Sequence, residues 1–171
     1  IKQIDSAPNL SIKKGNIKFE KVNFAYPKTE EQAIKNISFS IDGGTTAALV
    51  GHSGAGKSTI INLLPRFYDP QEGSISIDDQ DIRKVSLKSL RKNLSLVSQD
   101  IILFDDTIKN NIDFAKKNAT EEEIDKACKY AAADEFIDKL PKKYETIIGE
   151  NGVKLSGGQK QRISIARAIL K

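Results

Sequence analysis

Hydrophobic and polar residues alternate along two early stretches of the chain, residues 17–24 and residues 33–41. Successive side chains on a strand point to opposite faces, so this alternation predicts two strands with one buried face each. The mostly apolar run TTAALV at residues 45–50 predicts a central strand, because a strand covered on both faces loses the alternation. The short stretches SISID at residues 74–78 and LSLVS at residues 94–98 predict two more strands.

Helical patterns follow these strands and dominate the second half of the chain. Thr120 and Glu123 have the spacing of a capping box ahead of an apolar-periodic run, and Asp134 is predicted to cap a further helix that ends before Pro141. Helices are also predicted at residues 59–67, 86–93 and 107–115, and from Ser156 to the end of the chain. This order of elements predicts an α/β layered core with an inserted helical piece.

Composition and charge narrow the class of protein. The 171 residues are 39% hydrophobic and 29% charged, which is typical of a soluble globular domain, and no apolar run approaches the ~18 residues of a membrane span. The net charge of +4 comes from scattered lysines, so no nucleic-acid partner is expected. The single Cys128 excludes an internal disulfide and fits a reducing cytoplasm. Because the chain starts at Ile1, without Met or a signal peptide, we expect an excised fragment.

The stretch GHSGAGKS matches the phosphate-loop pattern G-x-x-x-x-G-K-[ST] at every fixed position. Its glycines let the backbone wrap around phosphate oxygens, and the helix that follows presents the positive end of its dipole to them. Lys57 would reach the β- and γ-phosphates, and the Ser58 hydroxyl would ligate Mg²⁺. The residues expected to hold the nucleotide phosphates are Gly51, His52, Ser53, Gly54, Ala55, Gly56, Lys57, Ser58 and Thr59.

A phosphate-loop enzyme also needs an acid for Mg²⁺ and a group that orients the attacking water. Asp78 and Asp100 each follow a predicted strand and are the two alternatives for the acid, although the strict alternation before Asp78 indicates a wet face. Gln99 is the more interesting residue, because a neutral amide can ligate Mg²⁺ and sense a γ-phosphate. The only histidine, His52, is interpreted as a solvent-facing spacer in the loop. The residues alone therefore predict an incomplete ATPase site.

The phosphate loop, Gln99 and the later stretch LSGGQ (residues 155–159) resemble the nucleotide-binding domain of ATP-binding-cassette (ABC) transporters over essentially the whole chain. The resemblance is closest to the exporter branch, especially lipid and multidrug exporters. It implies a phosphate-loop NTPase (RecA-like) core with an antiparallel β subdomain and a helical subdomain at about residues 101–160. It also implies that Tyr26 stacks on adenine; the alternative is a core or turn aromatic. Residues 149–152 (GENG) would contact intracellular helices, and Asn151 stands where the commoner form of this loop has a basic residue.

The resemblance also implies partners and a mechanism. The partner's ATP would be held, in a head-to-tail and preferably homodimeric pair, by Ser156, Gly157, Gly158 and Gln159. Residues 1–15 would link residues 16–171 to a transmembrane domain at the cytoplasmic face of the membrane, the fragment itself being soluble. MgATP binding and hydrolysis would drive export or flipping of a lipid or drug-like substrate, with Lys57 and Gln99 as catalytic residues and Ser58 and Gln99 as Mg²⁺ ligands.

The family pattern continues with a strand ending in Asp-Glu and then a switch histidine, and the sequence lacks both. We therefore expect a chain truncated before that strand. Such a chain is expected to bind MgATP weakly and to hydrolyse it negligibly. Two alternatives remain open. One is a soluble ABC-type ATPase acting on DNA or in translation, which would carry coiled-coil insertions, zinc-binding cysteines or a basic stripe. The other is a small phosphate-loop kinase, which would not need LSGGQ.

Overall fold

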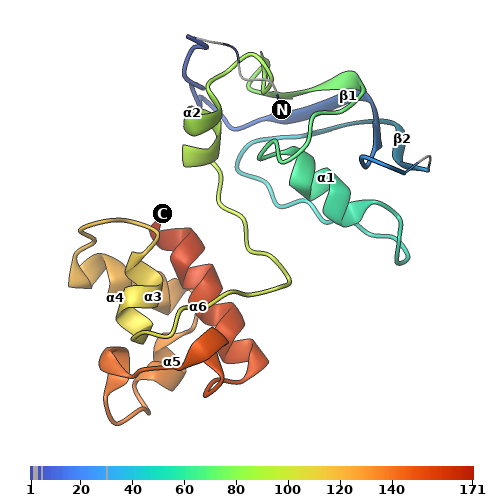
Figure 1. Ribbon diagram of the computed structural model, residues 1–171. Helices are drawn as coiled ribbons and strands as arrows, with labels where there is room; N and C mark the ends of the chain where they lie inside the picture. The colour runs from blue at the N-terminus through green and yellow to red at the C-terminus, as the bar shows by residue number, and fades with distance from the viewer. Residues whose placement is uncertain (2–3, 5, 30) are drawn as a thin grey trace. The chain divides into compact units, whose positions relative to one another are not determined.

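The chain forms two compact units in the computed structural model, Ile1–Leu94 and Ser95–Lys171, with the later unit running from yellow-green to red in Figure 1. The structure describes residues 1, 4, 6–29 and 31–171. Within those residues the first unit contains the β-sheet and two short helices, and the second is built from helices. The predicted α/β class, with an antiparallel sheet and a separate helical part, is confirmed.

An antiparallel four-stranded sheet organises the first unit, in the order β2-β1-β3-β4. Its strands are β1 (Ile17–Ala25), β2 (Gln32–Ile41), β3 (Glu72–Ile77) and β4 (Gln80–Asp81). Phe19 on β1 lies opposite Phe39 on β2 and Ile75 on β3, and the two phenyl rings stack with their centroids 4.6 Å apart. Alternate residues of neighbouring strands therefore share one apolar face. The three strands predicted from alternation are confirmed.

Two short helices cover part of this unit, α1 (Lys57–Leu63) and α2 (Leu87–Lys92) (Figure 1). Leu63 of α1 is completely buried in one hydrophobic cluster with Phe19 and Phe24 of β1. The helix ends earlier than the predicted residue 67, because Arg66 adopts a left-handed backbone with φ 51° that a helix cannot continue. The predicted second helix is confirmed, with Ser86 as its N-cap.

Two of the predicted strands are wrong. Residues 45–50 and residues 94–98 are irregular and do not belong to the four-stranded sheet. Val50 is 89% exposed, and Leu96 is 40% exposed. The apolar composition of the two runs favours burial, but residues 45–50 are all exposed in this structure. A strand, however, also needs a neighbouring backbone to pair with, and within the described residues no strand pairs with either run.

Residues 8–16 are fastened to the rest of the first unit. Leu10 is buried, and its backbone N–H donates to the Ser89 hydroxyl at 2.9 Å. The Asp78 carboxylate accepts the backbone N–H groups of residues 13–16 at 2.6–3.0 Å. These bonds hold the pKa of Asp78 well below its usual range, although the residue is only half-buried. That residues 1–15 link to an upstream membrane domain stays a prediction.

The second unit packs its helices around one hydrophobic core. Its helices are α3 (Ile108–Asp113), α4 (Glu121–Tyr130), α5 (Asp134–Ile137), η1 (Lys143–Glu145), η2 (Glu150–Gly152) and α6 (Gly157–Leu170). α6 lies beside α3 and α4 (Figure 1), and Ile112, Cys128 and Ile163 from these three helices are fully buried together. The capping box of Thr120 and Glu123 is confirmed.

The predicted cap of the following helix is wrong by one residue. Ala133 occupies the N-cap of α5, and no side chain caps it. Asp134 is instead the first residue of the helix, where its charge still complements the positive end of the helix dipole. Among the helices of the described residues, none is both long and apolar enough to cross a bilayer.

Candidate nucleotide-binding site

The phosphate-loop residues form a turn that leads directly into α1. Gly56 is the N-cap of α1, with a left-handed backbone at φ 82°, and its carbonyl accepts the first helical bond from the Ile60 N–H at 3.0 Å. Gly54 has the same φ of 82°. A Cβ at Gly56 would lie 2.6 Å from the Ala33 carbonyl oxygen of β2, whereas one at Gly54 would meet nothing within 4 Å. The sheet therefore lies directly behind the last glycine of the loop.

Lys57 folds its side chain back over this loop. Its ammonium donates to the carbonyl oxygens of Gly51 at 2.8 Å and His52 at 2.7 Å. An ammonium has three donors, so these two bonds leave one for an anion and hold the positive charge against the loop. The side chains of Ser53 and Ala55 are exposed, as is that of His52.

Ser58 is exposed on the first turn of α1, next to Lys57. Its hydroxyl is the type of hard oxygen ligand that Mg²⁺ accepts. Among the described residues, no three or more histidine, cysteine, aspartate or glutamate side chains are grouped so that they could hold a metal ion.

Tyr26 and Thr59 are joined in the interior of the first unit. The Tyr26 hydroxyl lies 3.1 Å from the Thr59 Oγ1, and Thr59 is only 6% exposed. The Tyr26 ring meets Phe24 and Tyr68 edge-on, at centroid distances of 5.0 and 5.2 Å. Tyr26 is half-buried, so it combines the packing of a core aromatic with a partly open side chain.

The two acidic alternatives differ in their surroundings. Asp78 directly follows β3, but its carboxylate is surrounded by the backbone N–H groups of residues 13–16, which gives it a structural role. Asp100 is exposed, and its carbonyl oxygen accepts the Ser98 hydroxyl at 2.5 Å. Neither carboxylate belongs to a cluster of metal-binding side chains among the described residues.

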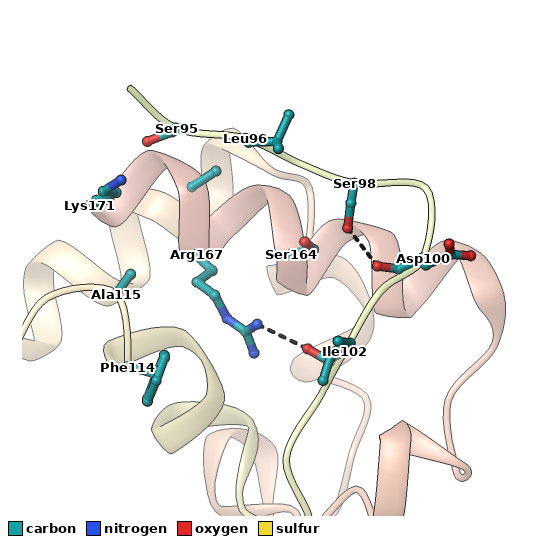
Figure 2. A pocket seen from close by; sticks show the side chains of 11 residues that line it. Ser95, Leu96, Ser98, Asp100, Ile102, Phe114, Ala115, Ser164, Arg167 and Lys171 are labelled. Atoms are coloured by element: carbon teal, nitrogen blue, oxygen red, sulfur yellow. Dashed lines mark hydrogen bonds between the residues drawn. The ribbon is translucent and has the colours of Figure 1, made fainter. Parts of the chain in front are cut away.

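Gln99 lies in the helical unit with an exposed side chain, between two residues that line a pocket of about 420 Å³. Figure 2 shows this pocket, in which Ser98 and Asp100 lie on the segment that passes over α6. The Arg167 side chain projects from α6 and donates to the Ile102 carbonyl at 3.0 Å (Figure 2). Arg167 thereby anchors the segment that follows Gln99.

Asn111 and Arg167 are positioning residues that the sequence pattern did not reveal. Asn111 is fully buried; its side-chain amide donates to the carbonyls of Phe104 and Thr107, and its Oδ1 accepts the Phe104 N–H at 2.9 Å. Arg167 donates to the Asn111 carbonyl at 2.8 Å and to its Oδ1 at 3.1 Å. Asn111 directly follows another asparagine, the exposed Asn110, in a stretch that also contains Lys109 and Asp113, so no pattern in the sequence marks it as the buried one.

Ser156 begins α6 with a capping box. Its hydroxyl accepts the Gln159 N–H at 3.3 Å, and its own N–H donates to the Gln159 side-chain oxygen at 2.9 Å. Gly157 and Gly158 are exposed, and a Cβ on either would meet nothing within 4 Å. Neither has a positive φ, so neither the backbone nor the packing of this chain requires glycine there.

A glycine loop that turns into a helix beside an antiparallel sheet defines the class of protein: a phosphate-loop nucleotide-binding protein of α/β type. The family model described as "ABC transporter" matches residues 34–171, and the chain belongs to that family.

Individual relatives agree with this assignment. The chain is 55% identical to an ATP-dependent lipid A-core flippase of Pectobacterium atrosepticum over 159 residues, which are 92% of this chain and 27% of the flippase. It is 53% identical to ABC transporter B family member 21 of Arabidopsis thaliana, also over 92% of this chain but 12% of the relative. A bacterial Atm1-family ABC exporter, solved with ATP bound, matches with a TM-score of 0.95 and 46% identity over 99% of this chain and 30% of the exporter chain. The chain thus spans less than a third of the length of each of these relatives.

Proposed function

We propose that this chain is the ATP-binding domain of an ABC exporter, which binds MgATP and pairs head to tail with a second such domain. In the full-length protein, hydrolysis at this domain would drive export or flipping of a lipid or other hydrophobic compound through a transmembrane domain. The names of the relatives, flippase and exporter, support this reading over a DNA-associated or translational ATPase. The domain would then work at the cytoplasmic face of a membrane.

The observation that carries the proposal is the phosphate loop before α1. Its two left-handed glycines and the Lys57 ammonium surround a position suited to the β- and γ-phosphates. The backbone N–H groups at the start of a helix favour anions there. Mg²⁺, when bound, neutralises phosphate charge, and the Ser58 hydroxyl would be its ligand from the first unit. Tyr26 would contact the adenine.

The glycines at the start of α6 support the proposed pairing. Glycine lowers helix stability relative to alanine, and no contact among the described residues explains two of them in succession. A close approach by a phosphate of another molecule's nucleotide would explain both, because a side chain at either position would keep the anion away. Ser156 and Gln159 would complete this contact through the capped helix start.

We further propose that the 171-residue chain alone binds MgATP weakly and hydrolyses it negligibly. The acid that follows β3, Asp78, is engaged by backbone N–H groups and is not free to hold a metal ion. Turnover by this chain of ~1 s⁻¹, within the usual range for enzymes, would contradict the proposal.

ATP binding is tested by calorimetric titration of the chain with MgATP. Lys57→Ala removes the charge at the loop and should weaken binding by about 10- to 100-fold. Lys88→Ala, which removes an exposed lysine of the same unit, serves as the control and should leave the affinity unchanged. Equal affinities of the wild-type chain and Lys57→Ala would show that the loop does not bind the triphosphate.

The pairing is tested by mixing two defective chains. One carries Lys57→Ala, which disables its own loop, and the other carries Gly158→Arg, which blocks the start of α6. In a head-to-tail pair of one chain of each kind, both defects fall in one site and the other site is intact. ATP-dependent dimers, measured by sedimentation, should therefore form in the mixture but not in either chain alone. Dimers that are equally abundant in all three samples would contradict the pairing.

A further inference from the structure

Three contacts fix the position of Tyr26, and one of them comes from the phosphate-loop helix. Its hydroxyl meets Thr59 Oγ1 at 3.1 Å, two residues after Lys57 in α1. Its carbonyl oxygen accepts the Thr29 hydroxyl at 2.8 Å. Its ring is bordered by two other aromatic rings at nearly perpendicular angles of 79° and 87°. A side chain held at the tip, the backbone and the ring edge has little rotational freedom.

The strand that leads to Tyr26 is fixed as well. The Gln71 side chain pairs with the backbone of Ala25, accepting its N–H at 3.0 Å and donating to its carbonyl at 2.9 Å. The amide thus acts as a short extension of the sheet at the residue immediately before Tyr26. The sheet fixes the backbone next to Tyr26, and α1 fixes the Tyr26 hydroxyl. The Tyr26 side chain therefore joins the sheet to α1.

We propose that Thr59 is a positioning residue for nucleotide recognition: its hydroxyl ties the Tyr26 ring to the phosphate-loop helix, which places the base-binding ring at a fixed offset from the phosphate-binding backbone. This inference rests on the proposed function, because the offset matters only if the chain binds an adenine nucleotide. It gives the Thr59 hydroxyl a role other than the phosphate binding that the sequence pattern predicts for this residue. Thr59 is only 6% exposed, and its hydroxyl already has the Tyr26 hydroxyl as a hydrogen-bond partner.

The consequence is a specific pattern of affinities. Loss of the Thr59 hydroxyl leaves the loop, Lys57 and the helix start intact but lets the Tyr26 ring move. Binding of the triphosphate group should then persist while the contribution of the base declines. Loss of the Tyr26 hydroxyl should have the same effect, because both changes break the same bond, and residues that share one interaction are not additive.

The test compares the affinities of MgATP and of magnesium tripolyphosphate, which lacks the base, by calorimetry on the intact chain. Thr59→Val should weaken ATP binding by about three- to tenfold and leave tripolyphosphate binding unchanged. Tyr26→Phe should give the same loss, the double variant no further loss, and Thr59→Ser, which keeps a hydroxyl, should restore ATP affinity. Thr45→Val is the matched control, since the hydroxyl of Thr45 donates to the Asp42 carbonyl instead.

Each other outcome overturns the inference. Equal weakening of ATP and tripolyphosphate by Thr59→Val would assign the hydroxyl to the phosphates, and unchanged ATP affinity would make the bond purely structural. Additive losses of ATP affinity in the double variant would show that the Thr59 and Tyr26 hydroxyls act independently. A wild-type chain that does not bind ATP would refute the proposed function itself, whereas ATP binding that depends on Lys57 but not on Thr59 would refute only the present inference. Circular dichroism melting confirms that each variant is folded.

Discussion

The close approach of the phosphate loop to β2 predicts that two glycines with the same backbone angle respond differently to the same substitution. Gly54 and Gly56 both have φ 82°. Alanine at either position therefore meets the same left-handed penalty, about 1–2 kcal/mol, part of which is offset because alanine restricts the unfolded chain. Only Gly56→Ala also brings a Cβ to 2.6 Å from the Ala33 carbonyl oxygen and 2.7 Å from Ile34 Cδ1.

The additional cost at Gly56 follows from these distances. A carbon and a carbonyl oxygen approach no closer than about 3.3 Å even in favourable contacts, so the loop and β2 must separate by about 0.7 Å. The Ala33 oxygen belongs to the backbone of a strand and cannot rotate away as a side chain would. Overpacking of this kind costs about 1–3 kcal/mol. We therefore expect a loss of about 1 kcal/mol for Gly54→Ala and about 3 kcal/mol for Gly56→Ala.

Urea denaturation followed by circular dichroism measures the loss in each variant, and hydrogen exchange at the amides of β2 and α1 shows where it occurs. Gly56→Ala should speed exchange in β2 and in the first turn of α1. Gly54→Ala should leave the β2 amides as they are in the wild-type chain. Free energies of unfolding that agree within about 0.5 kcal/mol between the two variants would refute the argument, because the backbone angle alone would then account for both.

Three further predictions concern the remaining polar and buried groups. Asp78→Asn should speed hydrogen exchange at residues 13–16, whereas Asp79→Asn should not. The folded state lowers the pKa of Asp78, so its ionised carboxylate stabilises the fold at pH values above the ordinary aspartate pKa of about 4. This stabilisation should be lost as the pH falls below that value. Asn111→Ala should cost the helical unit about 3 kcal/mol in urea denaturation, since it leaves buried backbone groups without a partner. Burial raises the pKa of the Cys128 thiol to about 11, so alkylation at pH 8 should require unfolding and its rate should rise with urea.

Periodicity predicted the elements that pair or pack within this chain. The alternating stretches became β1, β2 and β3, and the capping-box spacing placed the start of α4, because the determinants of these elements are local or come from neighbouring strands. The runs at residues 45–50 and 94–98 failed as strand predictions for the opposite reason. Their apolar residues record a preference for burial, but pairing depends on another backbone, which a local pattern does not contain.

The candidate site was predictable where backbone conformation determines its residues. The glycine and lysine spacing of the phosphate loop could be found directly, because only certain residues permit that turn and charge. The bond between Tyr26 and Thr59 joins residues 33 positions apart and could not be found in this way. Arg167 likewise contacts Asn111 across 56 positions. Long-range polar contacts have no sequence period, so they become visible only when the fold brings their elements together.

Four of the glycines in the two candidate binding regions form two pairs that differ in what the fold requires of them. Gly54 and Gly56 have left-handed backbones, so the fold itself requires them. Gly157 and Gly158 have neither a positive φ nor a close neighbour, and alanine at these positions would favour α6. Their presence therefore opposes the stability of the helix that they begin. Because no contact among the described residues offsets this cost, the exposed and capped start of α6 is consistent with the proposed contact to a phosphate of a partner's nucleotide.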